Sequence, residues 1–250
     1  MIRLMIALQF LTVFPIKLKQ MPSLKQNAES LLFYPLVGLM IGGLLFALTL
    51  LLQALPSLVL ATFVLVIWIW LTGGLHLDGL ADTADAWVGG FGDPERTLNI
   101  MKDPNCGPIG VLSLILISLL KLAALYLLIE MHQYDLIILI PLLGRLAPLF
   151  LFLTTPYVRK SGLGSAITEY LPRTIAFSIL FIITFLSCYL SLAGSIGLAS
   201  GIVTLLYLRF KFIQRIGGIT GDTVGAAIEI SETTILLTCA LSVFYLPALV

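Results

Sequence analysis

Residues 111–130 read VLSLILISLLKLAALYLLIE, an apolar run with one charged residue, Lys121, before the final Glu130. A helix that crosses about 30 Å of hydrocarbon needs roughly 20 predominantly apolar residues, and this run meets that length. Six further segments are of the same kind, at 31–53, 56–72, 136–154, 174–193, 195–209 and 233–249. The sequence therefore predicts an all-α, polytopic transmembrane helix bundle of about seven spans. Six is the alternative count, because 195–209 is short.

The composition supports a single integral-membrane domain over 1–250. Of the residues, 59% are apolar and 11% are charged, against about 25% charged in ordinary globular chains. A water-soluble fold is excluded, and membrane lipid is the expected surrounding. The net charge of +1 provides no broad cationic field, so no nucleic acid partner is expected. Three isolated cysteines have neither disulfide-framework nor zinc-ligand spacing.

The distribution of Lys and Arg predicts the orientation. Seven spans place the N-terminal segment and the loops 73–110, 155–173 and 210–232 on one side, with twelve of the fourteen cations. The opposite turns carry no Lys or Arg. The positive-inside rule then places the three long loops in the cytoplasm and the C-terminus outside the cell inner membrane. Chemistry is expected in these loops, because loops commonly carry function.

The strongest chemical signal is GGLHLDGLADTADAW at 73–87. On a helix, Asp78, Asp82 and Asp85 fall within about 60° of one another. Carboxylate oxygens in this arrangement suit Mg²⁺ or Mn²⁺ shared with substrate phosphates. His76 is a candidate to orient a ligand, donate to phosphate or carry a proton, and Asp82 and Asp85 join it as candidate catalytic residues. The alternatives are a solvated polar helix end and a structural histidine.

A second acidic element, GGITGDTVGAAIEISE, occupies residues 217–232. Asp222 and Glu229 are seven residues apart and share a helical face, and Glu232 lies roughly 60° further round. If both acidic elements meet, Asp78, Asp82, Asp85, Asp222 and Glu229 form a candidate metal site that accommodates two ions. In the alternative, Asp222 caps a helix and the glutamates meet solvent.

The loop between these elements supplies cations and backbone amides. Arg96 and Lys102 are candidates to bind a substrate phosphate, and the amides near Gly107 and Gly110, at a helix start, form a candidate anion site. Ordinary turn chemistry explains the glycines equally well. In that case Arg96 and Lys102 contribute only to the excess of Lys and Arg on the cytoplasmic side.

Two cations fall inside predicted spans. A charge at the depth of Arg145 costs about 2.5–3.5 kcal/mol on an insertion scale, so we expect it to find an anionic partner. A substrate phosphate is the favoured partner, and a carboxylate of the site is the alternative. Lys121 is expected to have a structural role and to reach the interface along its own stem.

Three motifs carry a resemblance over most of the chain: GGLHLDGLADTADAW at 73–87, PERTLNIMKDPNCGPIGV at 94–111 and GGITGDTVGAAIEISE at 217–232. Together they resemble the cobalamin synthase family, also called adenosylcobinamide-GDP ribazoletransferases. The resemblance implies a Mg²⁺-dependent membrane enzyme of the late vitamin B12 pathway. Such an enzyme joins adenosylcobinamide-GDP to α-ribazole or its 5′-phosphate and releases GMP.

The family's motifs map onto individual residues of this sequence. The acidic motif falls on His76, Asp78, Asp82 and Asp85, and the distal motif falls on Gly218, Thr220, Gly221 and Asp222. Thr220 and Gly221 are accordingly candidate substrate-binding residues. One departure is the stretch Pro104 to Cys106, where the family more often has a small polar or basic residue before the glycine.

Two alternative functions remain open at this point. CDP-alcohol phosphotransferases also carry aspartate-rich signatures in membrane spans, but their DGxxAR continuation is absent after Asp78 and Gly79. In a cation transporter the carboxylates would form a transit site. Transport sites tend to lie near the bilayer midplane, whereas these carboxylates lie in or beside loops at one face.

Overall fold

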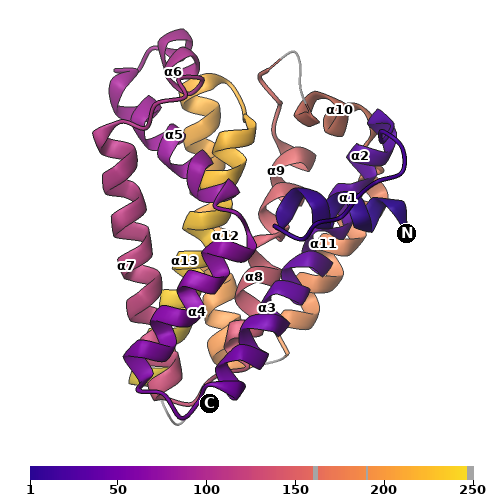
Figure 1. Cartoon of the computed structure of the whole chain (residues 1–250). Helices are drawn as coiled ribbons and strands as arrows, with labels where there is room; N and C mark the ends of the chain where they lie inside the picture. Colours follow the sequence, from indigo (N-terminus) through magenta and orange to yellow (C-terminus); the bar gives the residue numbers. More distant parts are fainter. Residues whose placement is uncertain (160–162, 190, 247–250) are drawn as a thin grey trace.

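The computed structural model describes residues 1–159, 163–189 and 191–246, which form an all-α bundle (Figure 1). The helices in chain order are α1 (Ile2–Leu11), α2 (Leu24–Ser30), the 3₁₀ turn η1 (Leu31–Phe33), α3 (Tyr34–Leu51), α4 (Ser57–Leu71), α5 (Leu75–Gly89), α6 (Pro94–Ile100), α7 (Pro108–Glu130), α8 (Leu136–Gly144), α9 (Leu146–Thr154), α10 (Leu163–Tyr170), α11 (Arg173–Ser187), α12 (Leu192–Ile216) and α13 (Gly221–Tyr245). Parts of the predicted segments 155–173, 174–193 and 233–249, and the predicted outer terminus Val250, lie outside the described residues.

The predicted polytopic bundle is confirmed. Five stretches are long and apolar enough to cross a membrane: Leu24–Leu51, α7, Leu136–Thr154, α12 and α13. Two further helix pairs pass the same test but are bent, α4 with α5 by 86° and α10 with α11 by 98°. Counting each bent pair once gives up to seven spans, in the predicted order. The short candidate at 195–209 lies inside α12, which has 25 residues.

Two segments predicted as long loops are largely helical. The segment 73–110 contains α5 and α6, and α7 begins within it. The segment 210–232 contains the end of α12 and the first half of its neighbour α13, so the connection is only 217–220. From the sequence alone, one interpretation is that the glutamates of α13 meet solvent. In the folded chain they are buried against cations.

The acidic motifs share one end of the bundle. In Figure 1 the upper end carries α2, α5, α6 and α10 together with the start of α13, α1 lies below α2 and α10, and the described part of α13 ends at the lower end. The connections between α3 and α4 and between α7 and α8 turn at that lower end. The two ends therefore divide the chain as the cation count predicts.

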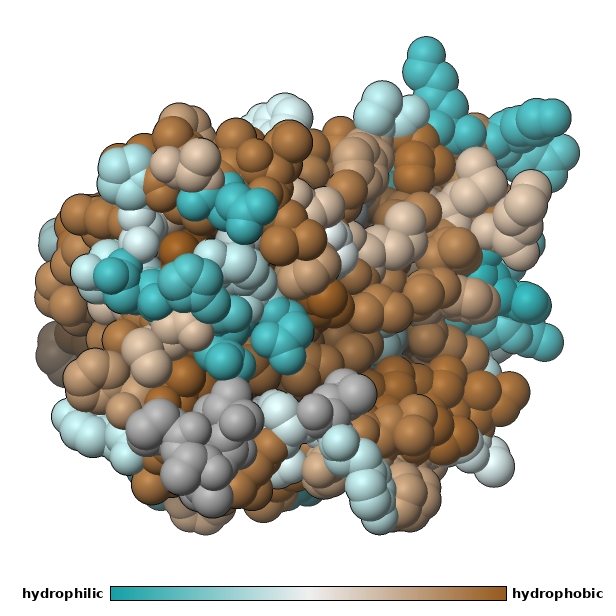
Figure 2. All heavy atoms as spheres, turned by 90° about the horizontal axis from the view of Figure 1, so that it is seen from below, coloured by the Kyte–Doolittle hydropathy of each residue, from teal (hydrophilic) through white to brown (hydrophobic). Residues whose placement is uncertain are grey.

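The bundle is built around a buried centre. The buried share of the most apolar stretch is 83% in Leu136–Thr154 and 61% in α13. It is only 28% in α7 and 22% in α12. The outer helices turn large apolar side chains away from the protein, among them Phe63, Leu119 and Phe181. Seen from below, most of the surface is hydrophobic and the hydrophilic residues occupy restricted patches (Figure 2). This is the surface that lipid requires.

Close packing of α3 on α8 depends on two glycines. A Cβ added at Gly38 would overlap the carbonyl of Pro141, and one added at Gly42 would overlap the carbonyl of Ile138. Small residues allow helix backbones to approach in membranes, where van der Waals contact drives association. The buried helix α8 is held against α3 in this way.

We expect Gly42→Ala to lower the free energy of unfolding by about 1–3 kcal/mol, because the added methyl group forces two backbones apart. The matched control is Gly43→Ala, where nothing lies within 4 Å of the added Cβ and alanine gains up to about 1 kcal/mol of helix propensity. Thermal unfolding of both variants in detergent measures the difference. Equal midpoints would contradict the role of Gly42.

Candidate active site

The site begins with the turn that separates α5 from α4. Gly73 and Gly74 adopt φ values of 61° and 70°, in the left-handed region that glycine enters without steric penalty. These two residues redirect the chain by 86°. Asp78 thereby falls in the first turn of α5.

The two predicted acidic elements meet where α5 crosses α13. A Cβ at Gly79 would lie 2.8 Å from the carbonyl oxygen of Asp222, and one at Gly225 would lie 3.4 Å from the Cα of His76. The charges of Asp78, Asp222 and Asp85 all act on the half-buried Asp82. The structure therefore gathers four of the five predicted metal ligands.

Asp85 occupies the anion site that the sequence suggested for substrate. Its carboxylate accepts hydrogen bonds from the backbone N–H of Gly107 at 2.6 Å and of Gly110 at 2.9 Å. Amides at the N-terminus of a helix favour negative charge. Here the negative charge is the carboxylate of Asp85 itself, and its hydrogen bonds connect α5 to the start of α7.

The segment before α13 has a role for each residue. Gly217 ends α12 with a φ of 77°, and a Cβ at Gly218 would overlap the carbonyl of Pro156. Thr220, fully buried, is the N-cap of α13: its Oγ1 accepts from the N–H of Thr223 at 3.2 Å. The alternative in which Asp222 caps this helix does not hold, because the N-cap is Thr220, two residues earlier. The hydroxyl of Thr220 is engaged in capping, whereas Gly221 lines a cavity.

A residue that the sequence did not single out completes this group. Val158 donates its N–H to the carbonyl of Ile219 at 2.9 Å, in a short bridge between the two segments. The next residue, Arg159, then donates from Nη2 to Oδ2 of Asp222 at 2.5 Å. Its Nε is buried with no partner among the described residues. Arg159 counted in the sequence only toward orientation, because no local spacing links it to Asp222.

A cavity of about 650 Å³ lies beside these groups. Its polar wall is formed by His76, Asp78, Arg159, Gly221 and Asp222. His76 is buried, and its Nδ1 has no partner within the described part of the chain. The cavity wall thus combines carboxylates and a guanidinium with a histidine whose buried Nδ1 has no partner in the described chain.

The other predicted phosphate-binding cations lie elsewhere. Arg96 and Lys102 are exposed and do not line the cavity. Arg96 stacks over the ring of Phe91 at 5.0 Å. Their predicted substrate contacts stay predictions, and Arg159 is the cation at the cavity wall.

The carboxylates suit a cation that is shared with a substrate. No group of three or more His, Cys, Asp or Glu in the described ranges is arranged to enclose a metal ion. Mg²⁺, however, usually keeps several waters and binds through one or two carboxylates plus substrate phosphates. Asp78, Asp82 and Asp222 fit that mode, since Asp78 and Asp82 accept no hydrogen bond from described residues.

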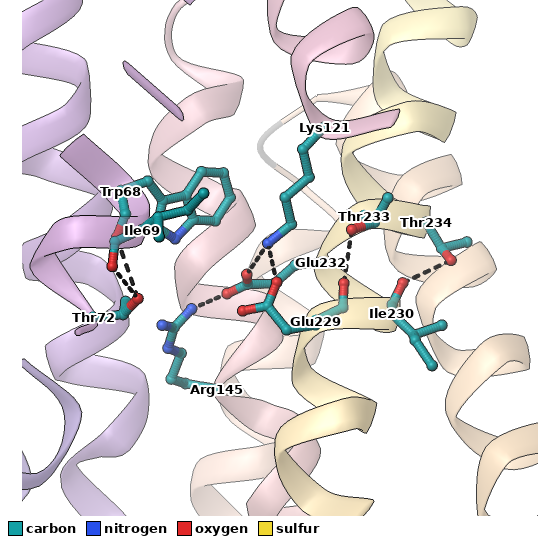
Figure 3. Close-up of polar contacts among 10 residues, drawn as sticks. All are labelled: Trp68, Ile69, Thr72, Lys121, Arg145, Glu229, Ile230, Glu232, Thr233 and Thr234. Atoms are coloured by element: carbon teal, nitrogen blue, oxygen red, sulfur yellow. Dashed lines mark hydrogen bonds and ion pairs between the residues drawn. The ribbon is translucent and has the colours of Figure 1, made fainter. Parts of the chain in front are cut away.

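Glu229 and Arg145 belong to a separate, buried network (Figure 3). Lys121 Nζ lies 2.6 Å from Glu229 and 2.9 Å from Glu232, and Arg145 pairs with the other oxygen of Glu232. All four side chains are nearly inaccessible, and Lys121 also lies 4.5 Å from the ring of Trp68. Lys121 is therefore structural as expected, but it does not extend to the interface.

This network corrects two placements. Glu229 is bonded to Lys121 and is not grouped with the aspartates. Arg145 has a carboxylate partner, the second of the two predicted possibilities, and it does not line the cavity. Two positive and two negative charges offset one another where no water competes.

The fold and the cavity define a class: polytopic helix-bundle proteins with a cavity whose wall is partly acidic. The family model for cobalamin-5-phosphate synthase matches residues 3–240. The chain therefore belongs to the cobalamin-5-phosphate synthase family and is a transferase of cobalamin synthesis.

Individual relatives agree over nearly their full lengths. A protein of Acinetobacter baumannii named adenosylcobinamide-GDP ribazoletransferase is 61% identical over 96% of this chain and 98% of its own. Proteins of the same name from Pseudomonas fluorescens and Stutzerimonas stutzeri are 50% and 49% identical over 96% and 97% of this chain, and over 100% and 99% of their own. No solved structure matches the chain.

The buried network yields a stability prediction. Arg145→Met leaves Glu232 with less countercharge, and breaking a buried ion pair costs about 3–5 kcal/mol. The double variant Arg145→Met/Glu232→Met removes both charges and leaves the Lys121–Glu229 pair. Thermal unfolding in detergent should place the double variant above the single one. If the double variant unfolds at the same temperature as Arg145→Met or at a lower one, the ion pair with Glu232 is not the contribution of Arg145 to stability.

Proposed function

We propose that the enzyme is Mg²⁺-dependent and joins adenosylcobinamide-GDP to α-ribazole or its 5′-phosphate, with release of GMP. The observation that carries the proposal is the convergence of Asp78, Asp222 and Arg159 at one cavity, with Asp82 close enough for the charges of Asp78 and Asp222 to act on it. Carboxylates that share a cation, next to a guanidinium, match the charge of a pyrophosphate. The names of the relatives give the substrate identities.

Each polar group at the cavity has a proposed task. When bound, Mg²⁺ would neutralise phosphate charge and polarise phosphoryl oxygens. Asp78, Asp82 and Asp222 would hold the ion, whereas Asp85 stays hydrogen-bonded to the amides at the start of α7 and fixes α5. The guanidinium of Arg159 has donors to spare, because its Nε has no partner in the described chain. It exchanges part of its bond with Asp222 for a phosphate oxygen.

The reaction is a displacement at phosphorus. A ribazole hydroxyl attacks the phosphorus attached to cobinamide, a new P–O bond forms, the P–O bond to GMP breaks with GMP leaving as its phosphate anion, and the hydroxyl proton passes to solvent water. Phosphoryl transfer depends chiefly on positioning and electrostatics, and the site offers both without a protein nucleophile. His76, with an unpartnered Nδ1 at the cavity, is proposed to hold the attacking hydroxyl.

The orientation in the membrane can be inferred from the charges at the end of the bundle that carries the aspartates. We infer that the aspartate end faces the cytoplasm across the cell inner membrane, because the cations gather there. Substrates would then enter from the cytoplasm. Neither alternative function is favoured by an observation: the aspartates lie at an end of the bundle and not in the midplane position of a transport site.

Purified protein supplied with adenosylcobinamide-GDP, α-ribazole and Mg²⁺ should release GMP, and chelation of the metal should stop the release. Asp82→Asn keeps the side-chain volume but loses the charge, so we expect a loss of about 100-fold or more in turnover. Its yield and thermal midpoint should match the unaltered enzyme. Substantial GMP release by Asp82→Asn at saturating Mg²⁺ would remove the metal assignment.

Arg159→Gln should raise the KM for adenosylcobinamide-GDP by about tenfold or more, since a hydrogen bond to a charged group contributes about 1.5–3 kcal/mol. The matched controls are Arg96→Gln and Lys102→Gln, which remove exposed cations outside the cavity. Steady-state kinetics on all three variants separates the candidates. A larger effect at Arg96 or Lys102 would return the phosphate contact to that loop.

A further inference from the structure

The second wall of the cavity is aromatic. Phe10 of α1 stacks on Tyr34 at the start of α3, with ring centroids 6.1 Å apart and planes at 23°. Phe152 of α9 stacks on Tyr157, with centroids 5.8 Å apart and planes at 25°. All four rings line the cavity. Two stacked aromatic pairs thus line one side of the cavity, and polar groups line another side.

The two walls come from different parts of the bundle. Helices α5 and α13 carry Asp78 and Asp222 in their first turns, and in Figure 1 α1, α2 and α10 lie together to the right of these two helices. The remaining lining on that side is mainly apolar, including Ile6, Leu31 and Ile167. A ligand that fills the cavity must therefore be charged at one end and flat and apolar at the other.

Two polar side chains on the aromatic wall are engaged within the protein. Gln9 donates its side-chain amide to the carbonyl of Ile16 at 3.0 Å, and Ser30 donates its hydroxyl to the carbonyl of Asn27 at 2.7 Å. The side chain of Asn27 and the two tyrosine hydroxyls complete the polar part of this wall, and the rest is aromatic or aliphatic. Flat apolar surface therefore dominates what this wall offers a ligand.

We propose, on the basis of the proposed function, that this aromatic wall binds the benzimidazole base of α-ribazole. Two planar bases belong to the groups that exchange at phosphorus, the guanine of the leaving GMP and the dimethylbenzimidazole of the entering ribazole. Guanine has several donors and acceptors on its edge, and burying them without partners is unfavourable. The dimethylbenzimidazole base is flat and mostly apolar, and it matches aromatic rings that stack in offset geometry.

The dimensions and the connectivity support this occupant. Cavities of about 300–1,000 Å³ enclose one ligand of drug size, and about 650 Å³ suits a nucleoside better than a corrinoid with its side chains. Tyr157 lies two residues before Arg159, so the aromatic wall and the phosphate contact share one short segment. A base on the rings leaves the ribose directed to the aspartates, where its hydroxyl is required.

The test compares two phenylalanines four residues apart. Phe10→Ala removes a ring of the cavity wall, and Phe14→Ala removes an exposed ring that does not line it. Phe10 is 43% exposed, so its truncation should leave the fold intact. We expect Phe10→Ala to raise the KM for α-ribazole about five- to tenfold and to leave the KM for adenosylcobinamide-GDP within about twofold. Phe14→Ala should change neither.

A substrate series makes the assignment specific to the base. The KM of the analogue without the two methyl groups, divided by the KM of α-ribazole, should be larger in the unaltered enzyme than in Phe10→Ala. An unchanged KM for α-ribazole in Phe10→Ala, or an equal rise for both substrates, would overturn the inference and point to a lipid chain or the corrinoid at this wall. Failure of the proposed function is a separate result, namely no GMP release by the unaltered enzyme.

Discussion

The site depends on the contact between the backbones of α5 and α13. Gly79 lies against the carbonyl of Asp222, so no side chain fits between them. This approach brings Asp78 and Asp222, which are far apart in sequence, to one cavity. The turn at Gly73 and Gly74 directs α5 toward the crossing. The amides of α7 hold its far end through Asp85.

The buried ion network extends this arrangement into the bundle. Glu229 and Glu232 lie on α13 below Asp222, and each has a cation from another helix. Lys121 comes from α7, and Arg145 from the break between α8 and α9, where Gly144 leaves room for the side chain of Glu232. Since unpaired charges are costly in a bundle of this kind, the pairing also fixes how these helices register with α13.

The sequence predicted the order and approximate number of spans because apolar length is a local property. The shared face of Asp78, Asp82 and Asp85 was equally local, since helical spacing alone determines it. The network was not predictable in this way: Lys121 and Glu229 are 108 residues apart, and their pairing exists only in the folded chain. For the same reason hydropathy placed a loop at 210–232 and gave no hint that Arg159 meets Asp222.

The structure divides the acidic residues by what neutralises them. Asp85 has backbone amides, and Glu229 and Glu232 have buried cations, so their charges are already balanced by the fold. Asp78 and Asp82 have no such partner among the described residues, and Asp222 shares only the partly exposed Arg159. Carboxylates that are held close together without sufficient countercharge repel one another, and a bound cation would reduce that repulsion. The acidic motifs therefore divide into carboxylates that the fold balances and carboxylates that it does not, and two of the latter, Asp78 and Asp222, line the cavity.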